Sequence, residues 1–281
     1  MRVYEDANQL RDALTSQRVC QKTVGFIPTM GALHDGHLSL VKTSMANHDV
    51  TVVSIFVNPT QFGPREDFLI YPRPLQQDKK KLHPCGDSLI LFLPQLAQMY
   101  PQFPTMSTRV EVPSLGRLLC GKTRKNHFGG VALIVIKLCH MVGRCTLYLG
   151  EKDFQQLVII RRLVDDLNLP VEVRGCPIYR EPNGLAMSSR NQYLSMKDRK
   201  QAGAIFTVLS TIKQTFLEEK KSPTELIVWG KKYLEARGIE TEYLQGVDAK
   251  TLRSKKRWRS GDRIVYAGKL SGVRLIDNLA L

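Results

Sequence analysis

The sequence predicts an α/β protein in which a parallel-sheet domain is followed by a smaller α+β domain. In the first part, apolar runs of strand length alternate with helical patterns, as in successive βαβ units. After Tyr179 the pattern changes, and Glu181-Pro182-Asn183-Gly184 indicates a turn. We therefore expect two domains, residues 1–178 and residues 179–281.

The expected elements follow from periodicity. Residues 1–20 are polar and helix-like. The strands expected after them are Val24 to Pro28, Val50 to Val57, Ser88 to Leu93, Thr146 to Leu149 and Val171 to Tyr179. A helix with Asp153 as its N-cap lies between the last two strands, and its covered face carries Leu157, Ile160, Val164 and Leu167.

The second domain is expected to contain two helices and three strands. The helices lie around Lys197 to Glu219 and Ser222 to Arg237. The strands lie around Glu242 to Val247, Arg263 to Lys269 and Val273 to Ile276. We find no internal repeat or low-complexity tract.

Composition is that of a globular protein in a reducing compartment. The chain has 281 residues, of which 43% are hydrophobic, enough for a conventional core. Its longest apolar stretch, Val131 to Val142, is too short to span a bilayer, so we expect no membrane association. No secretory leader pattern precedes the first expected strand. The six cysteines form no Cys-x-x-Cys pair, which favours free thiols and a cytoplasmic location.

The formal net charge of +15 raises the possibility of a nucleic-acid partner. The segment Arg253 to Arg259 is the best candidate, because Trp258 stands among cations. We favour a solvated loop between two strands and expect no nucleic-acid partner. Positive potential also attracts an anionic substrate, so charge alone does not separate the two hypotheses.

The segment Gly25 to Leu38 is the most informative in the chain, because it reads as a buried strand, a tight turn and a helix that opens with two histidines. A helix start offers free N–H groups to a phosphate. Gly31 and Gly36 allow close approach, and the imidazoles of His34 and His37 can stabilise charge on an attacked phosphate. The alternative is an ordinary turn with two solvent-facing histidines.

Further candidates follow other strands. In an open α/β sheet, ligands bind beyond the carboxyl ends of the strands. His34, Asn58, Lys152 and the segment ending at Arg190 each follow an expected strand, so we expect them at one edge.

Four motifs together carry a family resemblance. The histidine segment is followed, in order, by Ser54 to Gly63 (SIFVNPTQFG), Gly150 to Gln156 (GEKDFQQ) and Gly184 to Asn191 (GLAMSSRN). With these motifs the chain resembles the pantothenate synthetase (pantoate:β-alanine ligase) family, and the likeness continues through Leu275 to Asn278. This family belongs to the nucleotidyltransferase superfamily, which carries a His-x-Gly-His signature.

The resemblance implies a Rossmann-like nucleotidyltransferase domain and an ATP-dependent ligase. Pantoate would attack the α-phosphorus of ATP to give pantoyl adenylate and pyrophosphate, and β-alanine would then displace AMP. The expected partners are pantoate, ATP, β-alanine and a second copy of the chain, in a homodimer formed through the N-terminal domain. Mg²⁺ is expected with ATP, held mainly by phosphate oxygens and water.

The resemblance also assigns roles to residues. The catalytic set is His34, His37 and Lys152. The expected ATP-binding residues are Met30, Gly31, His34, Gly36, His37, Gly150, Lys152, Asp153, Tyr179, Met187, Ser188, Ser189 and Arg190. Four alternatives stay open: Lys152 as a surface lysine, Asp153 as a helix cap, the Met30 side chain as part of the core, and Gln61 or Gln156 as a surface polar residue.

Gln61 and Gln156 match the family's pantoate-binding amides, which can bond hydroxyl and carboxylate without repulsion. Asp78 matches a carboxylate near the metal, although Gln77 beside it is acidic in some relatives. Asn58 is expected to support the pocket. Gly129, where a side chain is usual, and a short segment around Gly143 depart from the family pattern.

The nearest rival function is another nucleotidyltransferase that transfers AMP to a phosphate ester. His34 and His37 are compatible with that reaction. Gln61, Gln156 and the Ser-Ser-Arg segment argue against it.

Overall fold

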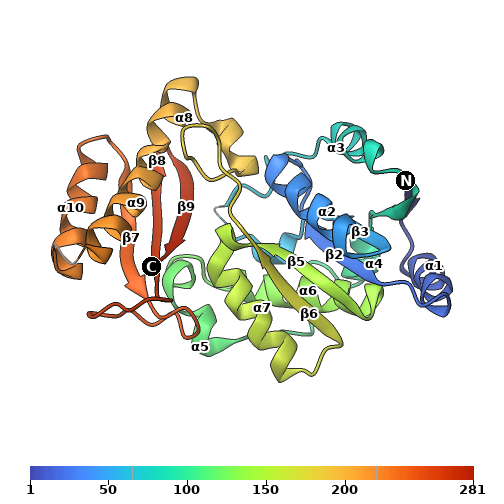
Figure 1. Cartoon of the computed structure of the whole chain (residues 1–281). Coiled ribbons are helices and arrows are strands. Elements are labelled where there is room, and N and C mark those ends of the chain that lie inside the picture. Colours follow the sequence, from blue (N-terminus) through green and yellow to red (C-terminus); the bar gives the residue numbers. More distant parts are fainter. Residues whose placement is uncertain (65, 219–220) are drawn as a thin grey trace.

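A computed structural model describes residues 1–64, 66–218 and 221–281 and confirms an α/β fold with a small α+β domain beside it (Figure 1). The large domain is built on a six-stranded, fully parallel sheet with strand order β1-β4-β3-β2-β5-β6. The strands are β1 (Arg2–Tyr4), β2 (Val24–Thr29), β3 (Val50–Ile55), β4 (Leu89–Phe92), β5 (Cys145–Gly150) and β6 (Val171–Cys176).

One strand was not expected, and two end earlier than expected: β3 at Ile55 rather than Val57, and β6 at Cys176 rather than Tyr179. Residues 1–20 were expected to be helix-like throughout, but β1 precedes the helix and pairs with β4 at the sheet edge. The helices of the large domain are α1 (Ala7–Val19), α2 (Asp35–Asn47), α3 (Leu75–Leu82), α4 (Leu96–Met99), α5 (Pro113–Gly116), α6 (His127–Val142) and α7 (Phe154–Asp166). Short 3-10 turns are η1 (Pro59–Gln61), η2 (His83–Ser88), η3 (Leu119–Lys122), η4 (Glu151–Asp153) and η5 (Ser189–Tyr193).

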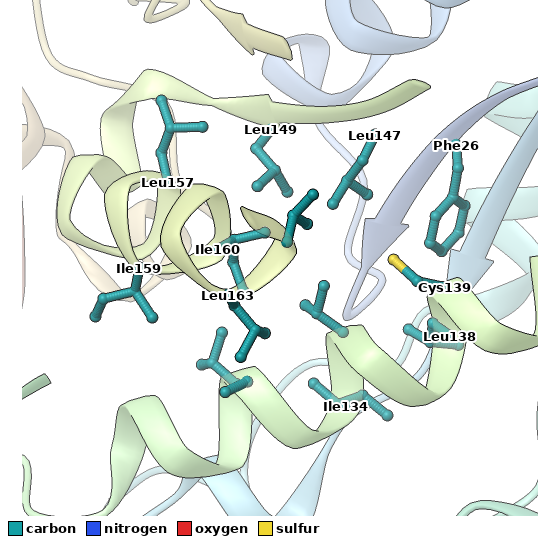
Figure 2. Packing of buried hydrophobic residues seen from close by; sticks show 14 of the residues in the cluster. Phe26, Ile134, Leu138, Cys139, Leu147, Leu149, Leu157, Ile159, Ile160 and Leu163 are labelled. Atoms are coloured by element: carbon teal, nitrogen blue, oxygen red, sulfur yellow. The ribbon is translucent and has the colours of Figure 1, made fainter. Parts of the chain in front are cut away.

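The large sheet is covered on both faces, which is why its strands read as continuous apolar runs. Phe26 of β2 packs with residues of α1, α6 and α7, whereas its neighbour Ile27 packs with residues of α2 and α3 on the other face. Figure 2 shows α6 and α7 meeting below the sheet, with Ile134 and Leu163 between them.

Helix α7 begins where expected but ends earlier. Leu157, Ile160 and Val164 are buried as predicted, whereas Leu167 is 49% exposed. The helix ends because Asn168 adopts a left-handed conformation, with φ of 50°, directly after Leu167. Asp153 occupies the N-cap position without a side-chain capping bond.

The small domain contains an antiparallel sheet of order β7-β8-β9. Its strands are β7 (Glu240–Val247), β8 (Arg263–Leu270) and β9 (Val273–Ala280), and its helices are α8 (Met196–Ala202), α9 (Ala204–Leu217) and α10 (Pro223–Glu235). The single helix expected from Lys197 is two helices, broken at Gly203, where a Cβ would lie 2.5 Å from the carbonyl oxygen of Asn183. Glu219, its expected end, lies outside the described residues.

The small domain has its own core, yet it also contributes to the core of the large domain. Ile205, Val208 and Leu209 of α9 pack onto the small sheet. In contrast, Val247 and Val265 join the cluster that also contains α6 and α7. We propose a domain boundary near residue 178, with the two domains docked through apolar surface.

The basic segment between β7 and β8 is the loop that we favoured. Trp258 is only 7% exposed, packs edge-on against Phe216 and donates to the carbonyl oxygen of Lys255 at 3.1 Å. Lys255 pairs with Asp262 at 2.7 Å. The aromatic side chain is therefore buried and unavailable to stack on a base.

The six cysteines are free thiols, as expected. Within the described ranges, no helix is both long and apolar enough to cross a membrane.

Candidate active site

The predicted site residues gather at the point where the strand order of the large sheet reverses. From β2 the chain proceeds outward through β3 to β4, then returns to the other side of β2 with β5 and β6. The carboxyl ends of β2 and β5 flank this switch point, where open α/β sheets bind ligands. His34 follows β2, and Lys152 follows β5.

One cavity at this edge is lined by almost every residue assigned from the sequence. Gly31 and Asp78 do not line it. The predicted residues that do are Met30, His34, Gly36, His37, Gln61, Gly150, Lys152, Asp153, Gln156, Tyr179, Met187, Ser188, Ser189 and Arg190. Segments that lie more than 150 positions apart in the chain thus meet around one space, as a two-substrate reaction requires.

Gly31 and Asp78 act together in shaping the loop before the histidines. Gly31 has a φ of +80°, which favours glycine. Asp78 is 1% exposed, and its two oxygens accept hydrogen bonds from the backbone N–H groups of Ala32 at 2.9 Å and Leu33 at 2.8 Å. Burial raises the pKa of Asp78. This geometry gives Asp78 a role in holding the loop, and its expected place near the metal stays a prediction.

His34 and His37 pack ring against ring at the start of α2. Their ring centroids are 4.0 Å apart, and a Cβ on Gly36 would lie 2.9 Å from the His34 ring. The backbone N–H of His34 donates weakly, at 3.4 Å, to Nδ1 of His37, which leaves the ring proton of His37 on Nε2. Burial, followed by the charges of Lys152 and Lys81, lowers the pKa of His34 to about 4. Burial and His34 hold the pKa of His37 well below its usual range.

Both imidazoles are therefore neutral at physiological pH, and this should be visible in stability. Between pH 6.5 and about 4 the unfolded chain protonates His34 while the folded chain does not, so the free energy of unfolding should fall as pH falls. In thermal melts between pH 7 and pH 5, His34→Gln should weaken this decline. The control His140→Gln, at an exposed helix position, should retain it. An equal decline in wild type and His34→Gln would contradict the neutral assignment.

Lys152 lies on η4, directly after β5. Its side chain is 20% exposed, and its Nζ lies 3.8 Å from Asp153 Oδ2. The lysine lines the cavity together with the two histidines and is not a solvated surface lysine. Its charge lowers the pKa of both imidazoles, so the three groups share one electrostatic environment.

Ser188, Ser189 and Arg190 reach the cavity from beyond the proposed domain boundary. Ser188 caps η5 through the backbone N–H of Arg190. The hydroxyls of Ser189 and Tyr71 lie 2.9 Å apart. Arg190 forms a two-pronged ion pair with Asp67, with both contacts at 2.8 Å. Sequence reasoning missed Asp67 and Tyr71, although they follow the SIFVNPTQFG motif closely.

Gln61 in η1, one of the two glutamines assigned to pantoate, is held by a buried amide network. Asn58, 1% exposed, donates to Gln61 Oε1 at 3.1 Å and to the carbonyl oxygen of Gly130 at 3.1 Å. It supports the pocket, as expected. A Cβ on Gly130 would lie 2.2 Å from the carbonyl oxygen of Thr60, so glycine is required there. Gly129 faces the carbonyl oxygen of Val110, where a Cβ would be 3.1 Å away.

Arg124 and His127 are further cavity residues that sequence reasoning did not single out. His127 Nδ1 donates to the carbonyl oxygen of Gln61 at 2.7 Å, which leaves Nε2 to accept from Arg124 at 2.9 Å. Arg124 also pairs with Glu66. Burial, followed by the charge of Arg124, lowers the pKa of His127 to about 4, so this ring is neutral as well.

A parallel sheet with a histidine-bearing helix start at its switch point defines a nucleotide-binding enzyme of the nucleotidyltransferase type. The family model described as pantoate-beta-alanine ligase matches residues 2–280. The chain belongs to the pantoate–β-alanine ligase family.

Individual relatives agree over the full length. The pantothenate synthetase of Thermotoga neapolitana is 42% identical over 282 residues, with 100% of both chains covered. The crystal structure of pantothenate synthetase from Thermus thermophilus superposes with a TM-score of 0.92 at 42% identity, covering 100% of this chain and 99% of that one. The pantoate-beta-alanine ligase of Francisella tularensis, solved with beta-gamma ATP and beta-alanine, gives a TM-score of 0.83 at 34% identity, with 100% and 97% covered.

Proposed function

We propose that this chain condenses pantoate with β-alanine to form pantothenate, in two steps at one site. In the first step the pantoate carboxylate attacks the α-phosphorus of ATP and pyrophosphate leaves. In the second, the β-alanine amine attacks the acyl carbon of pantoyl adenylate and AMP leaves. The observation that carries the proposal is the shared cavity, which two neutral histidines and Lys152 line together with the two glutamine amides.

The residue roles follow from charge and position. The substrate carboxylate is itself the nucleophile, so the protein has to orient it and stabilise the charge that develops on phosphate. Neutral His34 and His37 donate hydrogen bonds, and Lys152 supplies a full positive charge. Ser188, Ser189 and Arg190 bind the departing pyrophosphate from the second domain. The Asp153 side chain forms no hydrogen bond to the start of its helix, so it is available to bind the ribose hydroxyls.

Gln61 and Gln156 are the proposed pantoate ligands. The Gln61 amide is oriented by Asn58, and its Nε2 lies 2.8 Å from the sulfur of Met30. Gln156 lines the same cavity, whereas its neighbour Gln155 points away into the protein. An amide can donate to the pantoate carboxylate and accept from its hydroxyls.

Mg²⁺ is proposed to enter with ATP. Within the described ranges, no three histidine, cysteine or acidic side chains are grouped so as to hold a metal ion. Phosphate oxygens and water would therefore supply most of its ligands, as this ion prefers. The ion would offset phosphate charge during adenylate formation.

The small-molecule partners are proposed from the same chemistry. The Francisella tularensis relative was solved with beta-gamma ATP and beta-alanine, which supports ATP and β-alanine as substrates of this chain. A homodimer through the N-terminal domain and a cytoplasmic location are further proposals, supported by the family resemblance.

The test is pantoate-dependent exchange of labelled pyrophosphate into ATP in the absence of β-alanine. Exchange should require pantoate, because labelled pyrophosphate enters ATP only by attacking the pantoyl adenylate formed in the first step. Replacing pantoate with a phosphate ester should give none. Exchange with the phosphate ester alone would favour the rival nucleotidyltransferase.

Removing the Gln156 amide should weaken pantoate binding more than ATP binding. In Gln156→Ala, a buried polar group of bound pantoate would lose its partner, at a cost of about 1–3 kcal/mol, or roughly fivefold to 150-fold in the dissociation constant. Calorimetric titration of each substrate measures the difference.

The adjacent Gln155 offers a matched control. It is 6% exposed and bonds the carbonyl oxygens of Leu115 and Leu118 and the backbone N–H of Cys120. Gln155→Ala should lower the melting temperature without weakening pantoate binding more than ATP binding. Equal losses of pantoate and ATP affinity in Gln156→Ala would contradict the assignment.

A further inference from the structure

The turn that carries Lys152 is held by a side chain from the other domain. Asn278 lies on β9 and is 2% exposed. Its Nδ2 donates to the carbonyl oxygen of Glu151 at 2.9 Å and to that of Lys152 at 3.0 Å. One amide group thus bonds two consecutive carbonyls of η4.

A second residue of the small sheet fixes the direction of this amide. Arg263 on β8 donates from Nη1 to Asn278 Oδ1 and from Nη2 to Glu151 Oε2, the latter at 2.9 Å. Its guanidinium lies 4.0 Å from the centroid of the Phe154 ring. Because Oδ1 accepts from Arg263, the donor end of the amide must face the turn.

Lys152 depends on this turn because its own side chain is loosely held. Its contact with Asp153 is 3.8 Å long, and Asp153 itself is 48% exposed at the side chain. An ion pair of this kind contributes little to orientation. The backbone of η4, which Asn278 holds, therefore sets the point from which the Lys152 side chain enters the cavity.

We propose that Asn278 is a positioning residue for adenylate formation, acting through Lys152, and that Arg263 aligns its amide. This inference rests on the function proposed above. The small domain would then contribute to adenylate formation in two ways, through Asn278 and through Ser188 to Arg190. The competing explanation is that Asn278 only fastens the two domains together.

A double-mutant cycle separates the two explanations, because a residue that acts through Lys152 has nothing to act on once Lys152 is replaced. Asn278→Ala should lower the maximal rate of pantoate-dependent pyrophosphate exchange by at least about tenfold, the scale of a misplaced catalytic group. The KM for pantoate should change less. In the Lys152→Ala background, the further loss should be less than about twofold.

Arg274→Gln is the matched control for domain docking. Arg274 lies on the same strand and contacts Cys120 of the large domain at 3.4 Å, but it does not bond the Lys152 turn. The exchange rate of Arg274→Gln should stay near that of wild type. Chemically made pantoyl adenylate gives a second readout, because Asn278→Ala should leave β-alanine attack nearly unchanged.

Each outcome decides the inference. Additive losses in the cycle, or wild-type exchange in folded Asn278→Ala, would overturn it. If Asn278→Ala does not fold, Asn278→Asp keeps the volume and the acceptor for Arg263 but removes the donor, and it should show the same pattern. Failure of both variants to fold would make Asn278 a folding residue and overturn the positioning role. Absence of exchange in wild type would instead overturn the proposed function, and this inference with it.

Discussion

Replacing Lys152 by alanine should slow pantoate-dependent pyrophosphate exchange by about a hundredfold or more, the usual effect of losing one oriented partner of the transition state. Lys152 shares the cavity with the two neutral histidines, and its charge lowers the pKa of each. His34→Ala should have an effect of the same order. Exchange measured at saturating pantoate and ATP isolates this step.

The second half-reaction provides the internal control. Once pyrophosphate has left, only AMP must depart, so β-alanine attack on supplied pantoyl adenylate should suffer less in both variants. Lys152→Met, which keeps much of the length of the side chain without its charge, should be as slow as Lys152→Ala in exchange. Equal slowing of both half-reactions, or full exchange in Lys152→Met, would refute the assigned role of this charge.

The central sheet and the outline of the site could be predicted because both rest on local patterns. Strands buried on two faces read as apolar runs, and the histidine segment combines a strand, a glycine turn and a helix start within 14 residues, Gly25 to Leu38. The short strand β1 was missed, because three residues at a sheet edge carry too little periodicity to be distinguished.

The missed site residues share a different cause, since their roles depend on contacts between distant parts of the chain. Asp67 and Arg190 are 123 positions apart, and no local signal links them. Asp78 shows the same limit: its resemblance to a family carboxylate predicts a place near the metal, but gives no sign that its buried carboxylate bonds the N–H groups of Ala32 and Leu33. Such pairings are set by tertiary packing.

Truncation after residue 178 should leave a folded domain that binds ATP weakly and forms pantothenate at less than about a thousandth of the normal rate. Such a fragment contains all six strands of the large sheet and the helices that cover it. It would lose Ser188 to Arg190 and the Asn278 bonds to the Lys152 turn, and each loss of an oriented group can cost about a hundredfold or more. Circular dichroism, ATP titration and pantothenate formation measure the three properties.

The truncation also exposes surface that Val247, Leu252 and Val265 cover in the whole chain, so a lower melting temperature is expected independently of catalysis. The full-length variant Ser189→Ala/Arg190→Ala separates the two effects, because it keeps that cover and removes the proposed contacts with the departing pyrophosphate, together with the bonds to Tyr71 and Asp67. Its melting temperature should exceed that of the fragment, while its turnover should lie between the fragment and wild type. Since the fragment retains His34, His37 and Lys152, near-normal turnover would mean that these three groups suffice and that the small domain has no part in the chemistry.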